Sequence, residues 1–250
     1  MNYAAAVLTY FTKDILDRGR LDLFKRSIDS LVRSNFSGTI FVVDDGSEVD
    51  DHIKYIETVN DPRVVLHRKR ENGGLSKAFN TGTRLVLESG CEYGFLCNDD
   101  IVYSEDWHLP YLEVMENTDV KHLCFFSKNV IGSDGIPRSV ESKDHLINGL
   151  MLTEYSWVQG GVITFSKDQI NKIGYFKVMP GKLGHEHSNF TIRSIAHGFC
   201  FGFLDVKGSE ELLQYADETG EITTRGSDFL EQARQNAPYI NSNDYDPCIE

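Results

Sequence analysis

Two pairs of adjacent acidic residues, Asp44–Asp45 and Asp99–Asp100, each follow a short apolar run in this sequence. Neighbouring carboxylates suit a hard divalent cation, because Mg²⁺ and Mn²⁺ take oxygen ligands and commonly combine one or two carboxylates with substrate phosphates. Asp99 and Asp100 follow Asn98 and the apolar run 93–97, which would hold them at a rigid strand end. A solvated acidic turn is the alternative interpretation of this segment.

The first acidic pair could serve a nucleotide. A carboxylate at Asp44 or Asp45 can accept a hydrogen bond from an N–H of a nucleobase or from a ribose hydroxyl. The following Gly46 and Ser47 also permit an Asx-type turn that binds nothing.

A glycine pair precedes a predicted helix at Asn72-Gly73-Gly74, and Lys77 falls in the first turn of that helix. Glycine lets the backbone approach a ligand closely, and a helix start favours a phosphate. The segment is not a Walker loop, because the spacing G-x-x-x-x-G-K is absent. It predicts a loop that faces phosphate, with an ordinary helix entry as the alternative.

The second half of the chain carries an unusual cluster, His185-Glu186-His187, directly after Gly184. A carboxylate beside two imidazoles could supply a general base or a further metal ligand. A surface turn is the alternative, since H-x-H alone does not define a zinc site.

Trp157 and the pair Gly160–Gly161 place an aromatic face near bare backbone. This combination predicts a platform for an acceptor, and packing of Trp157 in the core is the alternative.

Apolar periodicity predicts an alternation of strands and helices that would position these side chains. In the first half, strands are expected at 4–10, 39–43, 63–67 and 93–97, and helices at 20–34, 50–60, 76–89 and from a cap at Asp106 to about residue 117. In the less regular second half, we expect strands at 122–130 and 157–165, a polar connection at 132–149, helices at 166–173 and 188–197, a loop at 174–185 and a last apolar run at 200–204.

Strands separated by helices imply a parallel sheet with right-handed crossovers, so the fold class is α/β. Ligands of such sheets bind beyond the carboxyl ends of the strands. The segments at 44–45, 72–74 and 98–100 all fall at or just past expected strand ends. The sequence therefore predicts that they line one cleft.

Composition excludes several classes of protein. The net charge of -13 argues against a broad nucleic-acid surface, and no apolar run is long enough to span a membrane. The five cysteines contain no C-x-x-C, and the N-terminus resembles a first strand rather than a secretory signal, so we expect a reducing, cytoplasmic compartment. No G-x-G-x-x-G follows an early strand, which argues against a dinucleotide oxidoreductase.

Acidic residues are concentrated near the C-terminus, where residues 206–250 carry ten acids against three bases. We expect a domain at 1–205 and an acidic extension at 206–250 that is helical near 210–215 and 229–234. Within the domain, 1–117 would bind nucleotide and metal, and 118–205 would bind the acceptor and carry the catalytic groups.

Taken in order, these segments resemble the family 2 glycosyltransferases of the GT-A fold, which has a Rossmann-like, mostly parallel central sheet flanked by helices. The resemblance spans roughly residues 4–203. It is carried by the motifs at 42–47, 72–74 with Lys77 and Asn80, 98–100, 160–161, 173–176 and 184–187, and by Arg193 and Gly198.

The resemblance implies a nucleoside diphosphate sugar as donor, most often UDP-linked, and Mn²⁺ or Mg²⁺ as cofactor. It implies the following roles for residues of the nucleotide and metal site: base contact by Asp44 or Asp45 near Thr9, nucleotide contact by Gly73, Gly74, Lys77, Asn80 and Asn98, metal binding by Asp100, and ribose or metal contact by Asp99.

Two positions depart from the family pattern. Asn98 stands where the first Asp of D-x-D is usual, and His187 stands where inverting members usually carry the catalytic Asp of a Glu-Asp pair. His187 could act as the base or ligate the metal, which would leave Glu186 as the base. The stereochemical outcome therefore stays open between inversion and retention.

The expected function is transfer of a hexosyl or pentosyl group to an acceptor hydroxyl on a glycan, a protein, a lipid-linked sugar or a modified nucleic-acid base. A non-catalytic module that binds a sugar nucleotide or a glycan is the alternative.

Overall fold

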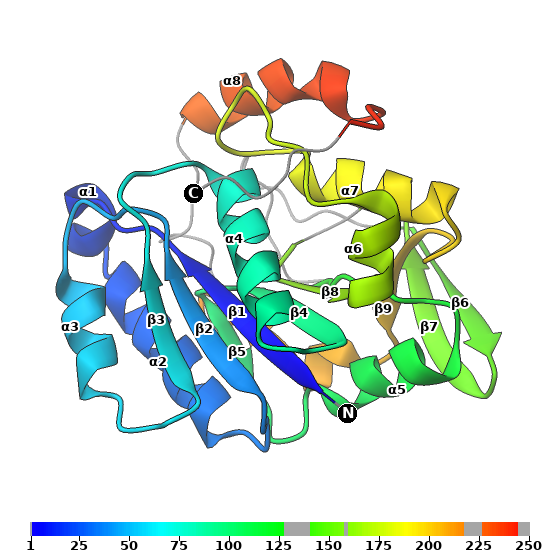
Figure 1. Ribbon diagram of the computed structural model, residues 1–250, viewed down its shortest axis with the longest axis horizontal. Helices are drawn as coiled ribbons and strands as arrows, with labels where there is room; N and C mark the ends of the chain where they lie inside the picture. The colour runs from blue at the N-terminus through cyan, green and yellow to red at the C-terminus, as the bar shows by residue number, and fades with distance from the viewer. Residues whose placement is uncertain (1, 128–140, 158–159, 218–226, 245–250) are drawn as a thin grey trace.

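The computed structural model describes residues 2–127, 141–157, 160–217 and 227–244, and a five-stranded sheet forms its centre. The strand order is β3-β2-β1-β4-β8, with β1 to β4 parallel and β8 antiparallel to β4 (Figure 1). The strands are β1 (Tyr3–Thr9), β2 (Thr39–Asp44), β3 (Val64–Arg68), β4 (Tyr93–Asn98) and β8 (Val162–Ser166). The predicted mostly parallel sheet is thereby confirmed.

Helices cover both faces of this sheet, which explains why its strands are apolar without alternation. In β1, Ala5 and Val7 pack with Phe24 of α2 on one face, and Ala6 and Leu8 pack with the residues of α4 on the other. The α-helices are α1 (Lys13–Asp17), α2 (Arg20–Arg33), α3 (Asp51–Thr58), α4 (Leu75–Glu88), α5 (Leu109–Asn117), α6 (Lys167–Ile173), α7 (Glu186–Ala196) and α8 (Ser227–Asn236).

Two helices begin two or more residues away from the predicted start. α5 begins at Leu109 after His108 rather than at Asp106, because Asp106 lies in the turn that precedes the helix. α7 begins at Glu186, two residues before the expected start at Ser188. α6 begins after Ser166 as predicted, with a capping box between Ser166 and Gln169.

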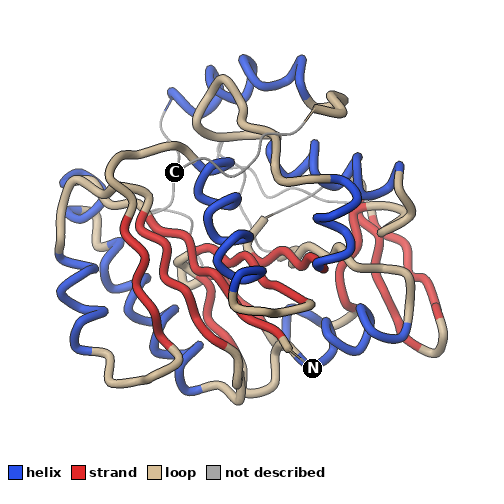
Figure 2. Tube along the Cα trace, in the orientation of Figure 1, coloured by secondary structure: helices blue, strands red, loops and turns tan. Residues whose placement is uncertain are grey.

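A three-stranded antiparallel sheet flanks the central one and was not anticipated. It comprises β6 (Ser142–Ile147), β7 (Leu150–Tyr155) and β9 (Phe203–Val206) in the order β6-β7-β9 (Figure 2). Its hairpin turns at Asn148 and Gly149, both with positive φ, as the Asn-Gly turns of two-residue hairpins require. The expected connection at 132–149 is therefore wrong where it overlaps β6, and residues 128–140 lie outside the described part of the chain.

The two other strands expected in the second half are also revised. Residues 122–127 form only an isolated bridge, between Cys124 and Ile163, and the expected strand 157–165 is reduced to β8. Residues 158–159, inside that expected strand, are among those the structure does not describe.

The acidic segment after residue 205 is joined to the rest of the fold. β10 (Leu213–Tyr215) pairs with β5 (Ile101–Tyr103), and short 3₁₀ turns occur at Ser209–Glu211 and Ala237–Tyr239. A strand thus replaces much of the helix expected at 210–215, whereas α8 covers the one expected at 229–234. Figure 1 shows α8 at the end of the molecule opposite the N-terminus, beside α7. No helix within the described ranges is both long and apolar enough to cross a bilayer.

His122 lies in the interior and gives the fold a measurable dependence on pH. Its Nδ1 lies 2.9 Å from the carbonyl oxygen of Thr164 and its Nε2 lies 2.8 Å from the hydroxyl of Thr191, which satisfies a neutral ring. Burial lowers the pKa of His122 to about 4. A histidine with a lowered pKa contributes stability above its unfolded pKa, and that contribution is lost as the pH falls towards the folded pKa.

We therefore expect His122→Gln to change the pH dependence of stability. Because glutamine does not titrate, the free energy of unfolding of the wild type relative to the variant should fall by about 2 kcal/mol between pH 7 and pH 5. Urea unfolding at both pH values measures this difference. A difference that stays constant with pH would contradict the assignment.

Candidate functional site

The carboxyl ends of β2, β1 and β4 lie side by side and bring the predicted polar residues to one edge of the sheet. In the strand register, Thr9 is opposite Asp44, and Leu8 is opposite Asn98. Asp99 and Asp100 follow Asn98 directly, in the turn before β5. The segments at 44–45 and 98–100 therefore lie at the same edge of the sheet, on either side of the end of β1, as predicted.

Asp99 is tied to the first strand. The hydroxyl of Thr9 donates a hydrogen bond of 2.7 Å to Asp99 Oδ2, and both residues are buried. This bond fixes one oxygen of Asp99 and leaves Oδ1 on the other side of the carboxylate.

A guanidinium that the sequence reasoning did not single out joins the two acids. Arg20, the first residue of α2, donates from Nη2 to Asp99 Oδ1 and from Nη1 to Asp100 Oδ2, the latter at 3.0 Å. The side chain of Arg20 is 16% exposed, and those of Asp99 and Asp100 are each 6% exposed. Both carboxylates therefore point at one positive charge.

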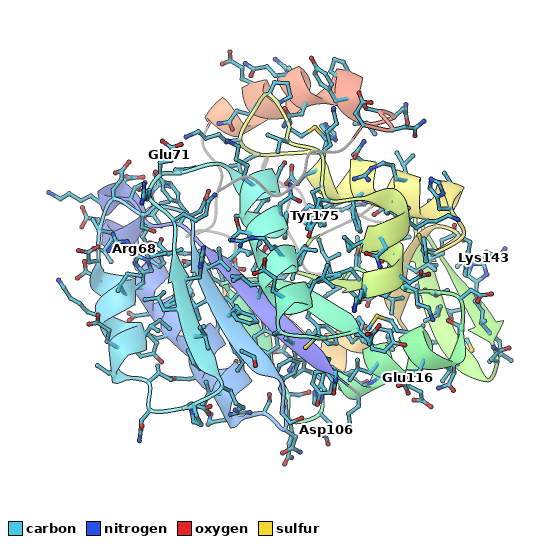
Figure 3. All side chains as sticks on the ribbon, in the orientation of Figure 1. Arg68, Glu71, Asp106, Glu116, Lys143 and Tyr175 are labelled. Atoms are coloured by element: carbon cyan, nitrogen blue, oxygen red, sulfur yellow. The ribbon has the colours of Figure 1, made fainter. Side chains whose placement is uncertain are left out.

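Asp44 occupies the interior rather than a ligand site. It is fully buried, and its carboxylate receives hydrogen bonds from Ser47 and lies 3.2 Å from His52 Nε2 and 3.1 Å from Nε of Arg68, which Figure 3 labels. Burial by itself would raise the pKa of Asp44, but the bonds to His52 and Ser47 outweigh it and lower the pKa. The bonds from Ser47 form the Asx-type turn given as the alternative, and the fully buried carboxylate of Asp44 has no surface for a nucleobase.

Asp45 instead holds the glycine loop. The backbone N–H groups of Gly73 and Gly74 donate to its two oxygens at 3.2 and 2.9 Å, and Lys69 Nζ forms a buried ion pair with it. Burial has the larger influence and raises the pKa of Asp45, although Lys69 and the two N–H groups oppose it. A carboxylate has about four lone-pair positions, so three donors leave room for one more.

The loop that Asp45 holds borders a cavity of about 280 Å³. Lys77 lines this cavity together with Gly73, Gly74 and, from the segment before α7, Lys182. The predicted loop residues therefore lie at an open space at the start of α4.

Asn80 lies in the interior, one turn further along α4. Its amide accepts a 2.8 Å hydrogen bond from Phe176 N and donates one of 2.9 Å to Phe176 O, and the residue is buried. These two bonds fasten the segment at 173–176 to α4. The implied nucleotide contact of Asn80 is therefore replaced by a structural role.

Glu186 and His187 occupy the first turn of α7, after Gly184 and His185 with positive φ. Glu186 is 3% exposed, and His187 Nε2 lies 3.7 Å from Glu186 Oε1. The alternative of an exposed turn is thus contradicted. A carboxylate and an imidazole that face one another can accept or relay a proton.

The glycine pair Gly160–Gly161 leaves room for neighbouring side chains to pack against its backbone. A Cβ at Gly160 would lie 2.1 Å from the ring of His187, and a Cβ at Gly161 would lie 2.6 Å from Tyr215 Oη. The backbone N–H of Asn98 donates a 2.8 Å bond to Gly161 O. The pair therefore joins the end of β4 to His187, and the bare face expected for an acceptor at these two glycines is occupied by side chains.

Trp157 is only half-buried and lies two residues after β7, where its ring and that of Phe126 are nearly perpendicular with 5.3 Å between their centroids. This placement leaves part of its surface available, so its role towards an acceptor remains a prediction.

The C-terminal segment holds the loop at 181–185, a contact that had no signal in the sequence. Asn236, fully buried at the end of α8, accepts a bond from Gly181 N at 2.7 Å and donates to Gly181 O, Leu183 O and Gly184 O. Asn189 of α7 donates in turn to three carbonyls between Tyr239 and Ser242. Residues 236–242 thereby fix the approach to Glu186.

Asp99 and Asp100, called the acidic pair from here on, fit a divalent cation. Their carboxylate oxygens are ligands of the right type, and both carboxylates are directed at one point, which the guanidinium of Arg20 occupies. Within the described ranges, no group of three or more His, Cys, Asp or Glu side chains could share an ion. The ring of His187 lies against Gly160, whose neighbour Gly161 accepts the N–H of Asn98, and the role of His187 as base or metal ligand stays a prediction.

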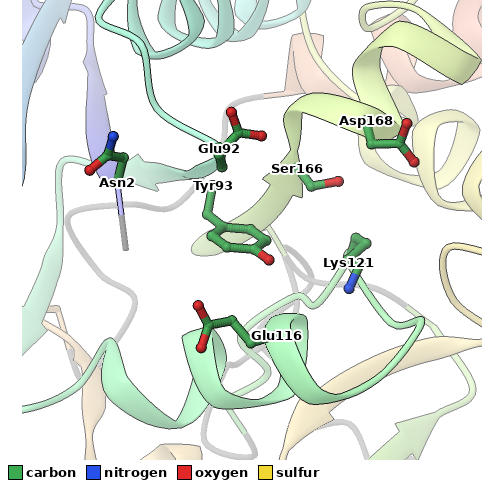
Figure 4. Close-up of a pocket in the computed structure, with 7 residues that line it drawn as sticks. All are labelled: Asn2, Glu92, Tyr93, Glu116, Lys121, Ser166 and Asp168. Atoms are coloured by element: carbon green, nitrogen blue, oxygen red, sulfur yellow. The ribbon is translucent and has the colours of Figure 1, made fainter.

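A second cavity lies elsewhere and does not share this chemistry. Figure 4 shows it near the start of β4, lined by Glu92, Tyr93, Glu116 and Lys121 among others. Lys121 already donates to the carbonyl oxygens of Met115 and Thr118. This cavity adds nothing to the site at the carboxyl ends of the strands.

Comparison with known proteins gives matches over most of the chain. The family model described as "Glycosyl transferase family 2" matches residues 18–198. A protein of Acanthamoeba polyphaga mimivirus named "Uncharacterized glycosyltransferase R363" is 28% identical over 97% of this chain and 94% of its own length.

Solved structures agree in fold at low identity. Residues 1–349 of S. aureus TarS give a TM-score of 0.55 at 17% identity over 78% of this chain, and this chain spans only 55% of that structure. The same fragment in complex with UDP-GlcNAc gives 0.58 at 16% identity, over 99% of this chain and 68% of that one. Mannosyltransferase PcManGT from Pyrobaculum calidifontis, in complex with GDP-Man and Mn²⁺, gives 0.54 at 13% identity over 97% of this chain and 70% of that one.

Proposed function

This chain belongs to glycosyl transferase family 2 and has the GT-A fold, and on that premise we propose that it transfers a sugar from a UDP-linked donor to an acceptor hydroxyl. The observation that carries the proposal is the convergence of Asp99 and Asp100 at the carboxyl end of β4, beside Thr9. Ligands of open α/β sheets bind at this edge.

The nucleotide would lie along the strand ends between Thr9 and the glycine loop. Asp45 has one remaining position for an N–H of the base, while Gly73, Gly74 and Lys77 border the adjoining cavity. The TarS fragment in complex with UDP-GlcNAc and PcManGT in complex with GDP-Man support a nucleoside diphosphate sugar as the donor class. UDP is our choice between these two nucleotides, following the more common donor of the family.

Asp99 and Asp100 would hold a divalent cation, Mn²⁺ or Mg²⁺, together with phosphate oxygens of the donor. When bound, such a cation neutralises the charge that grows on the diphosphate leaving group as the glycosidic bond breaks. The Mn²⁺ in the PcManGT structure supports this choice of cofactor.

Glu186 and His187 would supply the base that takes the proton of the acceptor hydroxyl. Their first-turn position on α7 is held by Asn236 from one side and by contact of His187 with Gly160 from the other. We assign residues 1–117 to nucleotide and metal, 118–205 to acceptor and base, and the segment after 205 to support of that base.

Thermal unfolding with nucleotides tests the donor assignment. UDP with Mn²⁺ at a hundredfold excess over its Kd should raise the Tm by roughly 5–10 °C, because a ligand that binds only the folded state stabilises it by mass action. GDP and dTDP should raise it less, and omission of Mn²⁺ should reduce the UDP shift. Equal shifts for all three nucleotides would contradict selectivity for UDP.

Turnover separates the enzyme from a binding module. Among UDP-sugars measured in the same thermal assay, the one that gives the largest shift should be cleaved slowly by water and faster with hydroxyl acceptors, read as release of UDP. Binding of donor without any cleavage across a panel of glycan, peptide and lipid-linked acceptors would favour the non-catalytic alternative.

A further inference from the structure

Arg20 lies where a cation that uses the acidic pair would lie. Its two terminal nitrogens each bond a different carboxylate, Asp99 Oδ1 and Asp100 Oδ2. Burial opposes the charge of this guanidinium, but the two acids outweigh that effect and raise its pKa, so Arg20 is positively charged at any physiological pH. The cluster of three side chains therefore carries a net charge of about -1.

This charge balance has a consequence for the donor. A diphosphate carries negative charge itself, so a cluster with a net negative charge repels it unless a further cation is present. Arg20 alone does not supply that charge, since the two carboxylates already outnumber it.

The oxygens that a cation needs are the ones that Arg20 holds. Asp99 Oδ2 is taken by Thr9 at 2.7 Å. The bonds of Arg20 show that Asp99 Oδ1 and Asp100 Oδ2 are oxygens of the two acids that converge on one charge. A divalent cation and a guanidinium at the same two oxygens would repel each other in a site this enclosed.

We propose that Arg20 is a built-in competitor for the metal: it neutralises Asp99 and Asp100 while no divalent cation is bound, and it leaves them when one binds. This inference rests on the proposed metal role of the acidic pair. The displaced guanidinium would then lie beside the donor, where its planar fork suits bidentate pairing with phosphate oxygens. Metal alone would bind weakly, and metal together with nucleotide would bind well.

Binding of Mn²⁺ to the full chain without nucleotide tests the proposal, followed by the electron paramagnetic resonance signal of free Mn²⁺. Arg20→Gln should bind Mn²⁺ about tenfold or more tightly than the wild type, because a charge-assisted hydrogen bond no longer has to be broken. Arg20→Lys keeps the charge but loses the fork and should fall between the two, which provides a second variant if Arg20→Gln folds poorly.

Arg18→Gln is the matched control. Arg18 lies two residues away, bonds Asp14 on the surface and loses the same charge on substitution. Its Mn²⁺ affinity should stay within about twofold of the wild type, since exposed ion pairs have little effect at a distance.

Two results would overturn the proposal in different ways. If the wild type binds Mn²⁺ with UDP but Arg20→Gln and Arg20→Lys bind Mn²⁺ alone no more tightly than the wild type, Arg20 is a fixed support for the acids and not a competitor. If neither the wild type nor any folded variant binds Mn²⁺ even with UDP, Asp99 and Asp100 do not hold a metal, and Arg20 cannot be a competitor for one.

Discussion

Asp100→Asn should reduce sugar transfer by roughly 10²–10³-fold or more, the loss expected when a group that stabilises transition-state charge is removed. Asparagine keeps the shape of the side chain but halves the negative charge with which the acidic pair can hold a cation. The residue lies in the turn between β4 and β5, and its main-chain carbonyl accepts a 2.7 Å hydrogen bond from Ala216 N whatever its side chain, so the fold should survive. Initial rates of UDP release with increasing Mn²⁺ measure the effect.

Asp106→Asn is the control for loss of one carboxylate. Asp106 lies on the surface, where it accepts a hydrogen bond from Asn35. It has no part in the proposed metal site, so its substitution should leave the rate unchanged. Undiminished turnover of Asp100→Asn in the presence of a chelator would contradict the metal assignment.

Glu186→Gln and His187→Ala should each slow the chemical step by roughly 10²–10⁴-fold if the residue changed is the base. Binding of UDP with Mn²⁺ should persist in both variants, because neither residue belongs to the acidic pair. Single-turnover rates at saturating donor, together with the thermal shift given by UDP, separate the two quantities.

The two substitutions also distinguish the residues. A large loss in Glu186→Gln with a small one in His187→Ala would identify Glu186 as the base, and the reverse would identify His187. His197→Ala, at the exposed end of the same helix, is the control and should retain full rate. Full rates in both variants would place the base elsewhere.

The sequence predicted the central sheet because its signal is local. Apolar runs such as 39–43 are buried on both faces, and the acids that follow them fall at strand ends whatever packs around them. The same reasoning placed Asp99 and Asp100 correctly at the carboxyl edge. It did not decide which of Asp44 and Asp45 would face a ligand. Successive side chains along an extended backbone point to opposite sides, and only the folded structure shows that Asp45 is the one that reaches the glycine loop.

Contacts between distant segments account for what was missed. Arg20 meets Asp99 and Asp100 across about eighty residues of chain, and nothing around Arg20 in the sequence marks it as different from Arg18. The β6–β7 hairpin did have a signal, the Asn148-Gly149 dipeptide between Leu146-Ile147 and the apolar start of β7, within the segment predicted to be a polar connection. Asn80 was misassigned because its partner, the backbone of Phe176, can be identified only once the chain is folded.

The hydrogen bonds of Asn236 also set an order of events during translation. The ribosome adds Asn236 fifty-five residues after Gly181, whose N–H it accepts. Strands β1 to β4 pair with one another in the order β3-β2-β1-β4, so they can assemble once β4 has emerged, and β8 joins them later. The loop before Glu186 lacks these bonds until Asn236 has been added, so a nascent chain stalled before residue 236 would have a formed sheet and an unsupported loop beside the proposed base.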